Sequence, residues 1–570
     1  MWGVAGLDWL VIIAYLAVVL VLGLGTFRRV KSASSFFIGD RRYGKLMMML
    51  NSFGAGTHSD QAVSVSSKTY SVGISGIWYE WLWLFATPFF WVLAPIFRRM
   101  RAVTTGDYFL VRYSRSVSVL YAVIGALQLM MNIGIMIKSS GALVTAVSGG
   151  RIDSQVAVLG MTSVFVVYSV VGGLHAAIVT NLVQGFLTVV FSFMILPFAW
   201  QAVGGLSGMR AALPDASLFA VVAPRGITAF YIAVIAINAL IGWVTQPGSM
   251  SMAAAGRREI EGRVGVMCGT VLKRICTVAW ALTALCALAY FLGRDIHPDQ
   301  AFGLMARELL PKVGPGLVGL FIATMFASVM STCNVLMIAS AGLLTQNIYR
   351  PLIAPGRPDR HYITAGRIAG AVIVGLGLLF ATQFSTVVKA METWWKVAAM
   401  MGIPFFLGLF WRRMTVAGAW ASTLAGFAAF LLTEKISLFG HVIWDFNATA
   451  APHLPEFLLF DGKLYLPWQM IIYLSAGLIA AVAVSLLTRR VPESQLKKFY
   501  ECLRTPIAPG EPETQPFTLP PGTKPAPRNV LIKHPDFEFP KPTLVGILGF
   551  LAGWAFVAVL IFTFYLIMKG

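Results

Sequence analysis

The sequence FGAGTHSDQ concentrates polar side chains at the centre of an otherwise apolar run. Gly54 and Gly56 permit a helix to unwind there and to free its backbone carbonyl oxygens. Thr57, Asp60 and Gln61 add side chains that can bind a cation or a polar solute. Inside a membrane, an unwound backbone is tolerated only where it lines a cavity or is buried by protein. The segment therefore predicts a broken helix that carries a binding site.

A second polar group lies in the apolar run FASVMSTCNV. Ser328, Ser331 and Thr332 follow the i, i+3 and i+4 spacing, which places their hydroxyls on one helix face. Hydroxyl and carbonyl oxygens without several carboxylates suit a weakly bound monovalent cation better than a divalent one. The alternative stays open that these hydroxyls bond back to their own helix or only pack against a neighbour.

Ionisable side chains interrupt other apolar runs. An unpaired charge in the middle of a bilayer costs at least about 2 kcal/mol, so each such residue is either functional or part of an internal ion pair. A pair between Glu80 and Lys273 is one such possibility. The residues of this kind are Glu80, Lys138, Lys273, Arg274, Glu392 and Lys396.

The composition is that of an integral membrane protein. Hydrophobic residues make up 57% of the 570 residues, and charged residues only 12%. A spanning helix needs roughly 20 mostly apolar residues, and the chain contains about fourteen such runs. The net charge of +20 does not indicate a nucleic-acid binder, because the basic residues lie mainly between the apolar runs. We therefore expect an all-α protein of about 14 transmembrane helices without a large soluble domain.

The distribution of Lys and Arg predicts how the helices are oriented. Alternate connections carry most of the cations, so these connections should be cytoplasmic, with both termini extracytoplasmic in a multi-pass protein of the cell inner (plasma) membrane. The first run lacks a basic start and a cleavage site, which predicts a retained helix. The runs lie at about 6–26, 46–70, 74–97, 116–147, 154–173, 176–204, 227–250, 264–292, 314–348, 361–384, 386–411, 415–433, 467–488 and 542–567.

Four sequence patterns, in order along the chain, resemble those of the sodium/solute symporters, the family of the sodium/glucose and sodium/proline cotransporters. The start LDWLVIIAYLAVVLVLG with SASSFFIGDRRYG resembles the first helix and the loop that follows it. YSVVGGLHAAIVTNLVQG is similar to a family signature that has an aspartate after its threonine. GLVGLFIATMFASVMSTCNVL resembles the sodium-binding helix, and LGLFWRR resembles the family's GLFWKR.

The resemblance implies a LeuT-type fold with a 5+5 inverted-repeat core, one extra N-terminal helix and three extra C-terminal helices. The first and second five-helix repeats would then take residues 46–204 and 205–411. Residues 1–45 would form the extra first helix and its cytoplasmic loop. Two additional helices would occupy residues 412–488, a cytoplasmic, proline-rich, solvated tether residues 489–541, and the last helix residues 542–570.

The resemblance also implies a sodium site between the broken helix and its partner helix. Its ligands would be the carbonyls of Gly54, Thr57 and Ser328 and the hydroxyls of Ser331 and Thr332. Family members that hold an additional sodium have an aspartate where this chain has an asparagine after the signature threonine. A neutral amide is a weaker cation ligand than a carboxylate, so we expect one Na+ per cycle.

The solute site is predicted from the sugar-transporting branch, whose polar positions carry Gln61, Glu80 in the step YEW and Lys273 in the step LK. These groups accept and donate hydrogen bonds, as a polyhydroxy solute requires. Lys138 instead favours an organic anion, although Asp60 and Glu392 can cancel its charge. The substrate-binding residues that we expect are Asp60, Gln61, Glu80, Lys138, Thr245, Gln246 and Lys273.

We expect a secondary active transporter that carries Na+ and a small polar solute, sugar or polyol-like, into the cell by alternating access. Its partners would be the solute, the sodium ion and membrane lipid, with a monomer as the transport unit. The motifs of common enzyme classes are not found, so we do not expect an enzyme. Uptake of an organic carboxylate, coupling to protons through His58 or Asp60, and a sensor or channel on the same scaffold stay open.

Overall fold

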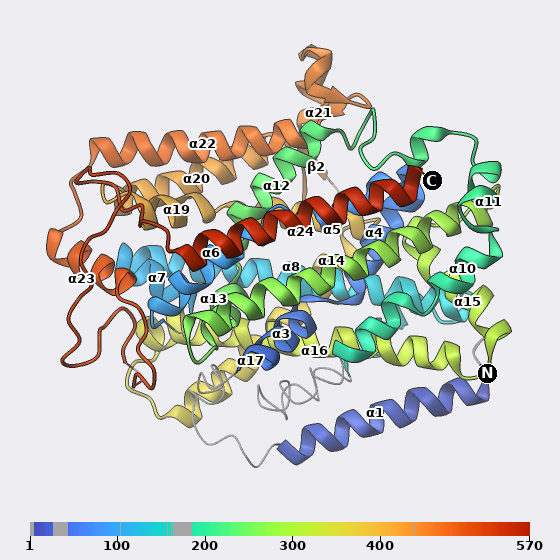
Figure 1. Cartoon of the computed structure of the whole chain (residues 1–570), viewed down its shortest axis with the longest axis horizontal. Coiled ribbons are helices and arrows are strands. Elements are labelled where there is room, and N and C mark those ends of the chain that lie inside the picture. Colours follow the sequence, from blue (N-terminus) through green and yellow to red (C-terminus); the bar gives the residue numbers. More distant parts are fainter. Residues whose placement is uncertain are drawn as a thin grey trace.

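The computed structural model describes residues 5–26, 44–102, 104–156, 158–160, 162–163, 185–438, 441–512 and 514–569. Most of these residues are helical, and the long helices lie side by side along the long axis of the molecule (Figure 1). Both termini lie at one end of this bundle, and α23 (Glu493–Arg504) lies at the other end. Arg99, Arg101 and Arg412 lie beside α23, so we call this end of the bundle the basic end.

Eight helices in the described part of the chain are long and apolar enough to cross a membrane, or nine if one bent pair counts as a single span. The predicted number of about 14 stays a prediction, because broken helices divide some spans into pieces too short to be counted. The eight are α8 (Arg115–Ser148), Gly185–Ala202, α14 (Glu259–Tyr290), Leu317–Ile353, α17 (Asp359–Thr382), Val387–Phe410, α22 (Leu466–Leu487) and α24 (Leu544–Lys569).

The remaining elements are shorter pieces between and within these spans. The shorter helices are α1 (Gly6–Thr26), α3 (Lys45–Gly56), α4 (Ser59–Val72), η3 (Ile74–Ile77), α5 (Trp78–Trp81), α6 (Thr87–Arg99), α7 (Thr105–Arg112), α10 (Leu196–Ala202), α11 (Gly205–Ala212), η4 (Ala216–Phe219), α12 (Ala229–Trp243), α13 (Pro247–Ala254), η5 (Pro298–Gln300), α15 (Ala301–Val313), α16 (Leu317–Leu344), η6 (Thr345–Ile353), α18 (Val387–Ala399), α19 (Gly402–Phe410), α20 (Val416–Leu432), α21 (Phe446–Thr449), η7 (Ala451–His453) and η8 (Glu456–Leu458). Two antiparallel pairs, β1 (Lys435–Leu438) with β2 (His441–Asp445) and β3 (Leu459–Phe460) with β4 (Lys463–Leu464), lie in the connection between α20 and α22.

The first helix break lies where the polar segment predicts it. α3 ends at Gly56, Thr57 and His58 adopt extended conformations, and α4 starts at Ser59. The new helix start is stabilised because the His58 amide donates to Oε1 of Gln61 at 3.3 Å. The glycine before the break and the capping glutamine after it therefore interrupt the helix locally.

A second break separates α12 from α13, which are bent by 67° relative to each other. Pro247 occupies the first position of α13, where its missing N–H costs nothing, and it cannot continue the helix that precedes it. The stretch GWVTQPGSMSM therefore contains a second helix break, with Pro247 at the start of its second half.

The interior of the bundle is closely packed around α14. Gly265 and Gly269 of α14 face α3, and a Cβ added at either position would lie 2.5 Å or 2.8 Å from Met48 or Met49 and their neighbours. Small residues at such points let membrane helices approach closely. This contact holds the helix that carries Lys273 directly against the first half of the broken helix.

The segment that follows α22 differs from the predicted solvated tether. It contains α23 and runs back against other connections, where Arg101 and Glu511 form a buried ion pair at 2.5 Å. The Phe517 amide donates to the Met100 carbonyl at 2.9 Å. Glu493 and Glu511 of this segment therefore pair with arginines far away in the sequence, which composition alone cannot reveal.

Candidate functional site

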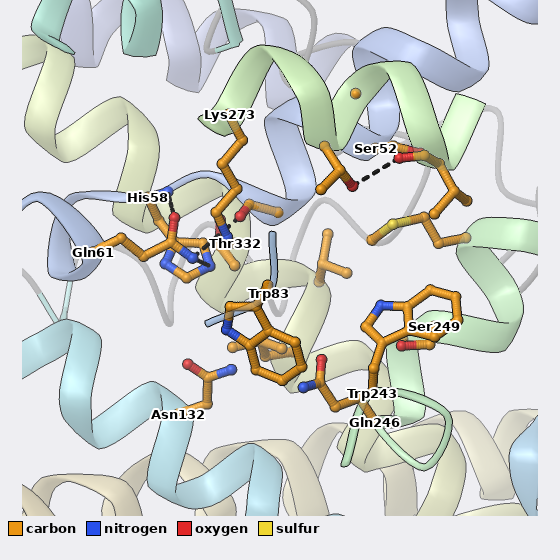
Figure 2. A pocket seen from close by; sticks show the side chains of 18 of the residues that line it. Ser52, His58, Gln61, Trp83, Asn132, Trp243, Gln246, Ser249, Lys273 and Thr332 are labelled. Atoms are coloured by element: carbon orange, nitrogen blue, oxygen red, sulfur yellow. Dashed lines mark hydrogen bonds between the residues drawn. The ribbon is translucent and has the colours of Figure 1, made fainter. Parts of the chain in front are cut away.

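A cavity of about 250 Å³ lies among α3, α4, α6, α8, α13, α14, α16 and α18. Figure 2 shows His58, Gln61, Lys273 and Thr332 on one part of its wall, and Trp83, Trp243, Gln246 and Asn132 on another. Both broken helices thus contribute to the same hollow, and so does the helix with the hydroxyl cluster.

The cavity lies nearer to one end of the bundle. On α14 it is lined from Val266 to Arg274, in the half of the helix nearer to its charged start at Glu259. It also reaches Met252 and Ala255 at the end of α13, shortly before Arg257 in the sequence. The other half of the bundle is filled by large side chains that are at most 2% exposed, namely Trp78, Trp81, Trp280 and Trp395. The hollow therefore extends from the middle of the bundle toward its basic end.

The first helix break places an ionisable pair at the cavity. Nδ1 of His58 contacts Oδ1 of Asp60, and both residues are buried yet line the hollow. Gln61 donates from Nε2 to the Gly56 carbonyl at 3.2 Å, across the break. The Gln61 side chain therefore bridges the break, and Asp60 and Gln61, whose role in solute binding stays a prediction, both line the cavity.

A second charged group lies between α5 and α14, on the same side of the cavity as His58 (Figure 2). Oε2 of Glu80 lies 3.3 Å from Nζ of Lys273 and 3.3 Å from Nη1 of Arg274. All three residues line the cavity. The Glu80–Lys273 pair that the sequence indicates as a possibility is present, and Arg274 joins it.

The predicted sodium ligands lie where α16 contacts α3 and α4. Gly54, Thr57 and Ser328 are buried, and Thr332 lines the cavity. The hydroxyls of Thr57 and Ser328 have no hydrogen-bond partner among the described residues, whereas Thr332 donates to the Ser328 carbonyl at 3.2 Å. The predicted alternative of back-bonding thus holds for Thr332, which still offers its lone pairs to a cation.

Two predictions fall where the structure gives no description. The side chain of Ser331 lies outside the described part, although its backbone belongs to α16. The signature with Thr180 and Asn181, on which the expectation of one Na+ depends, also lies outside the described residues. Both stay predictions.

Two predicted solute residues do not line the cavity. Nζ of Lys138 lies 3.4 Å from the Ala381 carbonyl, beside α17. Oγ1 of Thr245 donates to the Ala398 carbonyl at 2.9 Å, inside the packed core. Gln246, the next residue, does line the cavity. The neighbours that pack against α8 and against the second break decide these outcomes, and the local sequence does not reveal those neighbours.

Other charged residues that the sequence singles out are paired elsewhere. Glu392 accepts a hydrogen bond from the Tyr79 hydroxyl, which lies 3.1 Å from the hydroxyl of Tyr231. Lys396 forms an ion pair with Glu434. Glu392 therefore does not act in the cavity as a counter-charge, in contrast to the expectation from sequence.

Several polar wall residues are missing from the sequence-based prediction. Gln128 and Asn132 lie one turn apart on α8, and both amide atoms of Gln128 are buried without a hydrogen-bond partner in the described structure. Two amides at this spacing in an apolar helix are a signal that the sequence does contain. Asn51, Ser52, Ser249 and Thr270 also line the cavity.

Comparison with known proteins gives one consistent result. The model of the sodium:solute symporter family matches residues 36–426. The sodium/glucose cotransporter of Vibrio parahaemolyticus is 24% identical over 76% of this chain and 87% of its own length. The osmoregulated proline transporter OpuE of Bacillus subtilis (strain 168) is 24% identical over 73% of this chain and 87% of its own.

The sodium/pantothenate symporter of Escherichia coli (strain K12) is 23% identical over 75% of this chain and 90% of its own length. Among solved structures, the outward-open state of a Na+-coupled sialic acid symporter is similar, with a TM-score of 0.69 and 18% identity over 86% of this chain and 99% of that one. At this identity the structural likeness concerns the fold.

Proposed function

The chain belongs to the sodium:solute symporter family, and from this premise we propose that it carries a small hydroxylated solute, a sugar or polyol, into the cell together with one Na+ per cycle. It is a multi-pass membrane protein whose coupling ion is Na+. The observation that carries the proposal is the first helix break, whose polar end lines a cavity that Thr332 of α16 also lines.

The sodium site that we propose uses the carbonyls of Gly54, Thr57 and Ser328 and the hydroxyls of Ser331 and Thr332. The break frees carbonyl oxygens of α3, because the residues that would donate to them are no longer helical. Discontinuous helices bind the coupling ions of secondary transporters in this way. The hydroxyls of Thr57 and Ser328 have no hydrogen-bond partner among the described residues, which supports a junction where oxygen atoms are available to a cation.

The solute site that we propose is the cavity itself. Two carboxylates, of Asp60 and Glu80, face the two cations of Lys273 and Arg274, so these four charges cancel and suit an uncharged solute. Amides and hydroxyls supply hydrogen bonds, and indole rings supply flat apolar faces. The amides and rings in question are those of Asn51, Gln61, Gln128, Asn132, Gln246, Trp83, Trp243 and Trp394.

An organic anion is the second candidate, because Lys273 keeps 13% of its side chain exposed and can meet a carboxylate. Lys138, the other cation that favours an anion, lies outside the cavity. The names of the relatives include both kinds of solute, glucose on one side and pantothenate and sialic acid on the other. Charge balance in the cavity favours the neutral, hydroxylated class.

The mechanism that we propose is alternating access. The hollow extends toward the basic end of the bundle, which the positive-inside rule makes cytoplasmic, and packed tryptophans close the other half. The structure would then represent an inward-facing state with extracytoplasmic termini. Sodium bound between the break and α16 would favour the outward-facing state and the solute site together, a reciprocal linkage.

The organisation that we propose divides residues 46–204 and 205–411 into two inverted repeats. The broken α3–α4 and the broken α12–α13 would each be the first span of a repeat. Residues 1–45, 412–488 and 542–570 would be additions around this core.

A thermal-shift screen of the purified protein tests the proposal. Sugars, polyols and carboxylates are each added in NaCl and then in KCl, and we expect a sugar or polyol to raise the melting temperature only in NaCl. A hit confined to carboxylates would replace the solute class. Uptake that is unchanged when choline replaces sodium at fixed pH would overturn sodium coupling and favour protons.

A further inference from the structure

Glu80 is bound by two cations, although one would neutralise it. Oε2 of Glu80 lies 3.3 Å from Lys273 and 3.3 Å from Arg274. These cations are neighbours on α14, and the carboxylate is 3% exposed. A second cation beside one carboxylate oxygen is costly in a membrane. Its presence therefore indicates a role beyond neutralising Glu80.

The two cations are bound to different extents. Nη1 of Arg274 donates to the Glu80 carbonyl at 2.7 Å as well as to the carboxylate, and Nε1 of Trp81 donates to the Arg274 carbonyl at 3.2 Å. Arg274 is therefore joined to the short helix α5 through its side chain and through its backbone. Its side chain is 3% exposed.

Lys273 meets the same oxygen through its ammonium alone, and 13% of its side chain is exposed. It reaches from α14 into the cavity toward the first helix break (Figure 2). An ammonium on a flexible stem exchanges partners easily, whereas a guanidinium held by several bonds does not. The geometry thus separates a fixed cation from an exchangeable one.

We propose that Arg274 is a positioning residue that holds Glu80 and supplies its permanent counter-charge, so that Lys273 is free to exchange Glu80 for a polar group of the solute. This rests on the proposed function, because it assigns roles within the same cavity. With Arg274 in place, Lys273 can leave Glu80 without leaving a buried carboxylate unpaired, an event that would otherwise oppose solute binding.

Pulse labelling with acetic anhydride tests this proposal without a known solute. Acetylation of Lys273 in the purified full-length protein is followed by peptide mass spectrometry, and only the neutral amine reacts. In Arg274→Met, Lys273 becomes the sole partner of Glu80, and we expect its acetylation to slow about threefold or more. An unchanged rate overturns the proposal. A faster rate also overturns it, because it shows that Arg274 merely packs the site.

The double variant Glu80→Gln/Arg274→Met keeps the charge balance and serves even if the single variant does not fold. We expect its Lys273 labelling to lie within about threefold of the wild type, because the deleted pair was neutral. A larger rise would show that Lys273 is the main partner of Glu80, and would overturn the proposal.

A matched control is Arg263→Met, which removes a cation of α14 that lies over the Trp91 ring, 5.5 Å from its centre. It should leave Lys273 labelling unchanged. A sodium-dependent rise in melting temperature, measured on the same wild-type sample, tests the proposed function separately. Loss of that rise with the expected labelling pattern would reject sodium coupling and keep the role of Arg274.

Discussion

The two broken helices of this protein differ in what their polar groups contact. At the first break, Thr57 has a buried hydroxyl without a hydrogen-bond partner in the described structure, and Asp60 lines the cavity. At the second, the Thr245 hydroxyl donates to the Ala398 carbonyl, and the Thr245 carbonyl accepts from Tyr121 at 2.9 Å. Of the two residues predicted there to bind the solute, Gln246 lines the cavity and Thr245 does not.

An interrupted helix is therefore not by itself a binding site. An unwound backbone in a membrane must have partners, and those partners are either protein or ligand. At the second break, the hydroxyl and the carbonyl of Thr245 have protein partners, although Gln246 and Ser249 line the cavity. The first break has a buried hydroxyl without a described partner beside a cavity, and for this reason we propose it as the place where sodium and solute bind.

The largest effect should come from the two hydroxyls that we propose as sodium ligands. Ser331→Ala/Thr332→Ala removes two proposed ligands, and we expect the sodium concentration for half-maximal uptake to rise about tenfold or more in proteoliposomes. The control is Ser340→Ala on the same helix, whose hydroxyl only donates to the Met337 carbonyl at 2.8 Å. Unchanged sodium dependence in the double variant would rule out this site.

The next largest effect should come from Asp60→Asn, which removes the charge that His58 contacts. We expect the solute concentration for half-maximal uptake to rise about tenfold, because a buried charged partner of the wall is lost. Asp8→Asn is the matched control, since Asp8 is buried but accepts from the Gly319 amide at 2.8 Å, far from the cavity walls. Equal effects of the two variants would contradict a specific role for Asp60.

A smaller effect on transport should follow from Gln246→Ala at the second break. One neutral hydrogen bond to the solute is lost, so half-maximal uptake should need about threefold more solute, with sodium dependence unchanged. Gln469→Ala serves as control, because its amide donates to the Thr433 carbonyl at 3.1 Å outside the cavity. A shift as large as that of Asp60→Asn would show that the second break also binds the solute strongly.

The smallest effect on transport should come from Thr245→Val. The substitution keeps the shape but leaves the Ala398 carbonyl without this donor, so we expect a loss of stability of about 1–3 kcal/mol and a lower melting temperature. Sodium and solute dependence should change less than about twofold. A large change in either dependence with an unaltered melting temperature would make Thr245 a ligand.

Local sequence predicts the breaks, because their causes are local. The glycines before Thr57, the capping Gln61 and Pro247 act within a few residues of the chain. The ion pair between Glu80 and Lys273 also follows from the cost of burying either charge alone.

The sequence alone does not predict features that depend on long-range packing. Lys138 lies outside the cavity, with Nζ 3.4 Å from the Ala381 carbonyl of α17, and no local pattern records which neighbour each face of α8 contacts. The local sequence predicts a solvated tether after α22, because the partners of this segment are far away in the chain, as Arg101 is for Glu511. Arg274 is visible in the sequence as a buried cation, but its fixed attachment to α5 is not.

We propose that one Na+ binds between the first helix break and α16. Equilibrium binding of radioactive sodium to the purified protein tests it most directly, with the wild type beside Ser331→Ala/Thr332→Ala. We expect about one bound ion per wild-type chain and a sodium affinity at least about tenfold lower in the variant. Two ions per wild-type chain would contradict the proposed stoichiometry, and wild-type affinity in the variant would contradict the site.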